Sequence, residues 1–178
     1  GLPRVAYAGA FLTAPGGYPQ GRGWAPDAIV RTVTDATRHP GVTGGARTAV
    51  DEQADAGARV IKVALNADAG PTVSDEVLAA IVACAEDRGL PVVAHAQGPG
   101  QVERALDAGV SALAHAPFDV DVSRRLVSRA VAAGQVWIST VDIHRGAARD
   151  RTIANLRAFA ARGGRGLYGT DLGNGQLP

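Results

Sequence analysis

Residues 74–95, SDEVLAAIVACAEDRGLPVVAH, decide the fold class, because they combine a helix signal and a strand signal around one glycine. The apolar residues of the first part recur at the spacing of one helical face: Val77, Leu78, Ile81, Val82 and Ala85. Ser74 is suited to cap the N-terminus of that helix, and Gly89 is suited to follow its last turn. The second part is a short apolar run that ends at His95. We therefore predict a helix, a turn and a buried strand.

The same unit recurs on both sides of this stretch. An amphipathic helix and a glycine precede each of five short apolar runs, which we predict to be strands near 60–65, 91–95, 110–115, 136–140 and 166–170. Upstream, we predict a strand at 3–9, a glycine- and proline-rich loop at 14–26 and a helix around 26–38. Six strands joined only by helices indicate a parallel sheet that is covered on both faces.

Two architectures fit this order of elements, an open doubly wound sheet and a closed (β/α)8 barrel of the TIM type. Lys62 lies within one strand, His95 and His115 end two others, and Asp171 follows a fourth. A barrel brings residues from several strand ends together at one mouth. An open sheet usually carries a glycine-rich phosphate loop after its first strand, and no GxGxxG follows the first predicted strand here. The α/β barrel is favoured, here as a partial barrel of about six βα units.

The composition excludes several classes of partner. The net charge is +1, so the chain has no basic or acidic footprint and we expect no nucleic acid partner. No apolar run is long enough to cross a membrane, and we expect no membrane partner. Cys84 is the only cysteine, which rules out a disulfide framework and is compatible with a cytoplasmic location.

The chain contains no methionine and stops in a loop, so we expect residues 1–178 to be a single partial barrel domain, truncated at both ends. The exposed strand edges of an incomplete barrel favour association into a homo-oligomer.

Lys62 is the only lysine in the chain, and it stands within the apolar run VIKVAL. A buried lysine loses its proton readily. The neutral amine can then add carbon dioxide to give a carbamate, an anion that can bridge two metal ions. Imidazole and carboxylate are good ligands for zinc and similar ions, so Lys62, His95, His115 and Asp171 together predict a metal site.

Four motifs in this order resemble the amidohydrolase superfamily of metal-dependent hydrolases, in its imidazolonepropionase- and prolidase-like branch. They are GARVIKVAL, LPVVAHA, VSALAHAP and LYGTDLGNG, and the resemblance covers barrel strands 3 to 8. It implies one or two divalent ions, most readily zinc, and hydrolysis of amide or related C–N bonds in a small-molecule substrate through a metal-activated water.

The resemblance also implies a role for each matching residue. Lys62 would be the carbamylated bridging ligand, while His95 and His115 would bind a second metal ion. Asp171 would bind the first metal ion and carry the proton as the catalytic residue. The family's HxH pair on strand 1 has no counterpart here, and we expect His39, in a loop, to be solvated.

Two further residues are expected to bind substrate at the barrel mouth. Tyr18 lies in the GGYP loop that follows the first predicted strand, and His144 follows the run QVWIST.

Two other functions fit the same residues. Lys62 is also the type of residue that a Schiff-base lyase or aldolase uses as its nucleophile. The other alternative to an amidohydrolase is a barrel fragment without catalytic activity.

Overall fold

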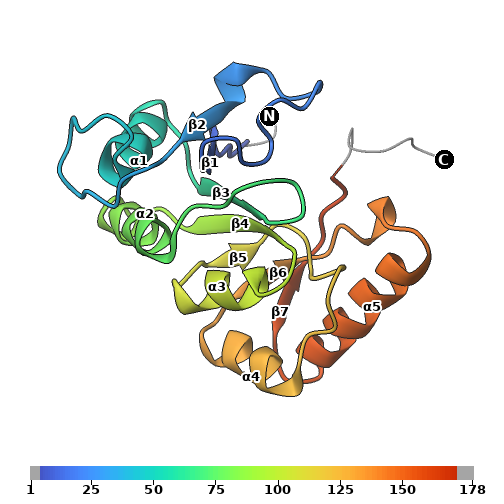
Figure 1. Ribbon diagram of the computed structural model, residues 1–178. Helices are drawn as coiled ribbons and strands as arrows, with labels where there is room; N and C mark the ends of the chain where they lie inside the picture. The colour runs from blue at the N-terminus through green and yellow to red at the C-terminus, as the bar shows by residue number, and fades with distance from the viewer. Residues whose placement is uncertain (1–4, 172–178) are drawn as a thin grey trace.

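Seven parallel strands form one sheet in the computed structural model, which describes residues 5–171. The strands are β1 Phe11–Thr13, β2 Val30–Thr32, β3 Ile61–Asn66, β4 Val92–Gln97, β5 Ala112–Leu113, β6 Val136–Ile138 and β7 Arg165–Leu167. Their order across the sheet is β2-β1-β3-β4-β5-β6-β7. Within the described residues the sheet begins at β2 and ends at β7 without closing, and Figure 1 shows its curvature.

Five α-helices alternate with the strands, as predicted. They are α1 Ala46–Asp55, α2 Asp75–Asp87, α3 Gln101–Asp107, α4 Arg124–Ala132 and α5 Gly146–Ala160. They lie along the outer side of the curved sheet (Figure 1). The predicted cap is confirmed, since the Ser74 hydroxyl accepts the Val77 N–H at 3.3 Å, and Gly89 has a φ of 66° after the last turn. No helix between residues 5 and 171 is both long enough and apolar enough to cross a membrane.

The N-terminal third departs from the prediction. The first strand is Phe11–Thr13 rather than 3–9, of which residues 3 and 4 lie outside the described part of the chain. The predicted helix around 26–38 is wrong, because a short 3-10 turn, η1 Asp27–Ile29, leads directly into β2. The segment IVRTVT is rich in β-branched residues, which favour a strand. β2 pairs with the edge of β1 opposite to β3, so the sheet has seven strands instead of six.

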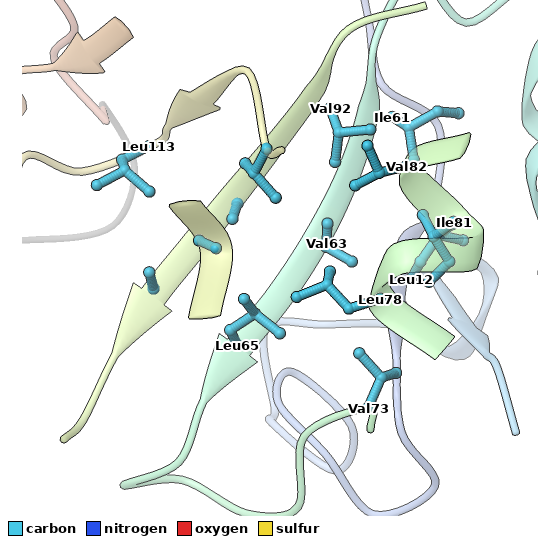
Figure 2. Close-up of a cluster of buried hydrophobic side chains, with 14 of the residues drawn as sticks. Leu12, Ile61, Val63, Leu65, Val73, Leu78, Ile81, Val82, Val92 and Leu113 are labelled. Atoms are coloured by element: carbon cyan, nitrogen blue, oxygen red, sulfur yellow. The ribbon is translucent and has the colours of Figure 1, made fainter. Parts of the chain in front are cut away.

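The pleat of β3 separates the hydrophobic core from the candidate site. Ile61, Val63 and Leu65 are fully buried and pack on the helical side, in a cluster that includes Leu78 and Ile81 of α2 (Figure 2). The alternate residues of the strand, Lys62, Ala64 and Asn66, therefore face the inner side of the sheet. Because the sequence of this strand is almost continuously apolar, it does not indicate which residues face the core and which face the candidate site.

Candidate functional site

The candidate site is built on the inner face of β3 and β4. These strands pair in register, with Lys62 beside Val93, Ala64 beside His95, and Asn66 beside Gln97. Side chains that are level with one another on neighbouring parallel strands share a face. Lys62, His95, Asn66 and Gln97 consequently lie on one surface, with Lys62 one step nearer the start of its strand.

A bend in the backbone brings His115 to the same surface. Ala112 pairs with Val93, while Leu113 points into the core and is fully buried. Strict alternation would turn His115 toward the helices, but β5 ends at Leu113 and the chain bends at residues 114 and 115. The rings of His95 and His115 meet edge to face, with centroids 4.8 Å apart and planes at 83°. The expectation that the two histidines face each other is confirmed.

Each histidine ring has one nitrogen engaged by a polar neighbour. Nδ1 of His115 lies 2.9 Å from the Thr140 hydroxyl, and Nε2 of His95 lies 3.2 Å from both the Asn66 amide nitrogen and the Gln97 amide oxygen. Such contacts orient a ring for its task. These contacts do not involve Nε2 of His115 or Nδ1 of His95.

Burial keeps both imidazoles neutral. It lowers the pKa of His95 to about 4, with a smaller contribution in the same direction from the charge of Lys62. It lowers the pKa of His115 to about 3, and the neighbouring His95 adds to the effect. A neutral imidazole is the form that binds a metal ion.

Lys62 is also perturbed. Burial lowers its pKa to about 8, and the charge of Asp171 opposes the shift. Its ammonium lies 5.6 Å from the centre of the Phe11 ring. At pH 7 a pKa of about 8 leaves about one-tenth of the amine neutral.

The other predicted residues surround this group. Tyr18 stacks on His95, with ring centroids 5.0 Å apart, and its pKa is raised, first by burial and then by the charge of Asp171. His144 stacks on Phe118 at 4.3 Å and is buried, which lowers its pKa. Asp171 follows β7 in a left-handed conformation, with a φ of 50°. Its negative charge partly offsets the lowering of the His95 pKa.

All six predicted residues thus lie in one region, whereas His39 is exposed, as predicted. Four further residues contact them and were not predicted from the sequence: Asn66, Gln97, Phe118 and Thr140. Asn66 and Gln97 are polar residues at the carboxyl ends of apolar strands, which is the same signal that identified the histidines.

The described residues fit part of a metal centre. Two adjacent neutral imidazoles are suitable zinc ligands, with an amine and a carboxylate in the same region. Between residues 5 and 171, however, no group of three or more His, Cys, Asp or Glu residues is placed to hold a metal ion.

Solved structures of a dipeptidase, an amidohydrolase and an ochratoxinase share this fold. A Xaa-Pro dipeptidase with bound methionine in the active site is 21% identical, with a TM-score of 0.73 over 99% of this chain and 50% of its own. An amidohydrolase is 22% identical, with a TM-score of 0.74 over 96% and 49%. The A. niger ochratoxinase is 20% identical, with a TM-score of 0.65 over 95% and 46%.

The chain therefore shares its α/β fold with these structures, and it spans about half the length of each. No protein-family model matches the sequence, and no curated protein does.

Proposed function

We propose that the protein is a metal-dependent amidohydrolase that cleaves amide or related C–N bonds in small-molecule substrates. The observation that carries the proposal is the His95–His115 pair, two neutral imidazoles 4.8 Å apart at the ends of neighbouring strands. A pair of histidines with only a structural role would not require a lysine of lowered pKa on the same face of the sheet.

His95 and His115 would hold a divalent ion such as Zn²⁺, through the two ring nitrogens that Thr140, Asn66 and Gln97 do not contact. When bound, the ion would polarise the substrate carbonyl and lower the pKa of a water molecule. Thr140 would hold the His115 ring in place through its 2.9 Å contact.

Lys62 and Asp171 would complete the chemistry of the chain. The neutral Lys62 amine would form an N–C bond to carbon dioxide and release one proton, which converts a neutral group into an anionic carbamate ligand. Asp171 would take a proton from the attacking water and give it to the leaving nitrogen. Tyr18 and His144, on either side of the histidine pair, would contact the substrate.

Zinc binding tests this proposal directly. We expect purified protein to bind zinc, measured by mass spectrometry of the metal content, and we expect amide hydrolysis by the intact barrel to require metal. His95→Ala and His115→Ala should each remove the bound zinc, whereas the control His39→Ala changes an exposed histidine and should retain it. Equal zinc content in all four proteins would contradict the proposal.

The lowered pKa of Lys62 favours one other function, that of a Schiff-base lyase or aldolase. Borohydride together with a carbonyl substrate would then trap an adduct on Lys62, and turnover would continue in the presence of a chelator. In the amidohydrolase, Lys62→Arg should abolish metal-dependent turnover, because guanidinium stays protonated. Lys62→Ala should recover some activity when a small carboxylate is added.

A further inference from the structure

The contacts of Asn66 and Gln97 with His95 Nε2 require opposite protonation states of that nitrogen. An amide nitrogen can only donate a hydrogen bond, so the contact from Asn66 Nδ2 at 3.2 Å requires His95 Nε2 to carry a lone pair. An amide oxygen can only accept, so the contact to Gln97 Oε1 at 3.2 Å requires Nε2 to carry the proton. The two contacts belong to different tautomers of the neutral ring.

The other hydrogen bond of the Asn66 amide favours a lone pair, rather than a proton, on His95 Nε2. Asn66 Nδ2 also donates to Gln97 Oε1 at 3.0 Å, so that oxygen already has a donor. With the lone pair on Nε2, both N–H groups of Asn66 are used. With a proton on Nε2, one N–H of Asn66 would point at another N–H, in a site where Asn66 is only 5% exposed. A buried donor without an acceptor is costly.

The oxygen of the same amide has no such partner. Asn66 Oδ1 is buried, and no hydrogen bond to it is found within the described part of the chain. If the amide turned over, this oxygen would lie beside His95 Nε2 and could accept a proton carried there, provided that Gln97 Oε1, now 3.0 Å from Asn66 Nδ2, moved away from it. The two orientations of the amide therefore correspond to the two tautomers of His95.

We propose that Asn66 is a positioning residue that holds His95 in the Nδ1–H tautomer in the metal-free protein, and that metal binding requires this tautomer to reverse. The inference rests on the proposed function for its second half, since Nδ1 is the nitrogen that remains for a metal ion. A ligating nitrogen must be free of its proton. A metal ion at Nδ1 would require the ring proton to lie on Nε2, where a turned Asn66 amide would accept it.

The ring ¹⁵N chemical shifts of His95 in metal-free protein at pH 7 test the first half without any metal. We expect a protonated Nδ1 and an unprotonated Nε2 in the wild type. Asn66→Ala removes the donor and adds no charge, so the proton should move to Nε2, where Gln97 accepts it. His115, whose Nδ1 contacts Thr140, serves as the internal control and should keep its shifts if the variant is folded.

Zinc titration tests the second half. Asn66→Asp places a group that only accepts beside Nε2, so the Nε2–H tautomer should already be present before metal binds. We expect its zinc affinity to rise by about tenfold, which corresponds to one hydrogen bond to a charged group. Zinc should reverse the wild-type His95 shifts and leave those of Asn66→Asp nearly unchanged.

The two failures are distinguishable. A proton on Nε2 in the metal-free wild type, or unchanged shifts in a folded Asn66→Ala, would overturn the inference whether or not zinc binds. Absence of zinc binding by a wild type that shows the Nδ1–H tautomer would contradict the proposed function and the metal-linked half, and would leave the role of Asn66 in the free protein supported.

Discussion

The indole of Trp137 lies flat against the ring of Phe159, with the centroids 4.0 Å apart and the planes 8° from parallel. Trp137 belongs to β6 and Phe159 to α5, and both side chains are fully buried. The indole N–H donates to Gln135 Oε1 at 3.0 Å, so burial leaves no polar atom of the ring without a partner. This stack attaches α5 to β6 of the sheet.

Phe159→Ala should lower the free energy of unfolding by about 3–5 kcal/mol, because it removes a buried ring and leaves a cavity against Trp137. Urea unfolding followed by Trp fluorescence would measure the loss. Leu167→Ala is the control, since this side chain of β7 is half exposed, and it should cost less than about 1 kcal/mol. Equal losses would show that the stack does not contribute specifically.

Asn155→Ala should destabilise the loop that follows His115. The Asn155 amide donates to the carbonyls of Pro117 and Val120, at 2.9 and 2.8 Å, and its oxygen accepts the Val122 N–H at 3.1 Å. Loss of three hydrogen bonds around a buried side chain should cost about 2–4 kcal/mol.

The isosteric Asn155→Asp provides the matched variant. It keeps the acceptor for Val122 but places a carboxylate oxygen against two carbonyls, so chemical unfolding should show it to be at least as unstable as Asn155→Ala. Wild-type stability of Asn155→Asp would contradict the role of the two donated bonds.

Lys62→Met should stabilise the protein at pH 7. The folded-state pKa of Lys62, about 8, lies below its ordinary value of 10.5, so the folded state disfavours the charged amine. Below pH 8 the charged form is present in both states and this cost is complete, and it disappears as the pH rises toward 10.5.

Removal of the charge should raise the free energy of unfolding by about 1–2 kcal/mol at pH 7, with allowance for solvent screening. The gain should shrink between pH 8 and 10.5. Lys62→Arg keeps the charge and should show no gain. A destabilised Lys62→Met would mean that the ammonium makes compensating interactions in the folded protein.

Acid should destabilise the metal-free protein through its histidine pair. The folded-state pKa values of His95 and His115, about 4 and about 3, lie below the ordinary value of 6.5. At a pH between these values the unfolded state binds protons that the folded state does not. The contribution to stability is thus complete above pH 6.5 and declines as the pH falls toward 4.

Each histidine should contribute a slope of up to about 1.4 kcal/mol per pH unit over this range. Urea unfolding from pH 7 to 5 would measure the slope, and His115→Gln should reduce it by the contribution of one histidine. His39→Gln changes an exposed histidine and should leave the slope as it is. A wild-type slope in His115→Gln would contradict this assignment.

The sequence by itself determined the alternation of helices and parallel strands after residue 46 and the location of the polar residues at strand ends. These features follow from local physics: helical periodicity, glycines after helices, the cap at Ser74 and short apolar runs. The resemblance of the motifs to amidohydrolases pointed to the same fold, which the solved structures share. The prediction of a helix around 26–38 was wrong. Pairing with β1, rather than the local sequence pattern, makes this short β-branched segment the strand β2.

Only the tertiary structure decided how the site is arranged. Strand alternation would have separated His115 from His95, and the bend after Leu113 brings their rings together. The shared contact of Asn66 and Gln97 with one ring nitrogen depends on the register between β3 and β4, which pairs residues 31 positions apart. The low pKa values of the two histidines and of Lys62 arise from burial by segments distant in the chain. Sequence periodicity describes which face a residue occupies, whereas register and backbone bends determine which atoms meet.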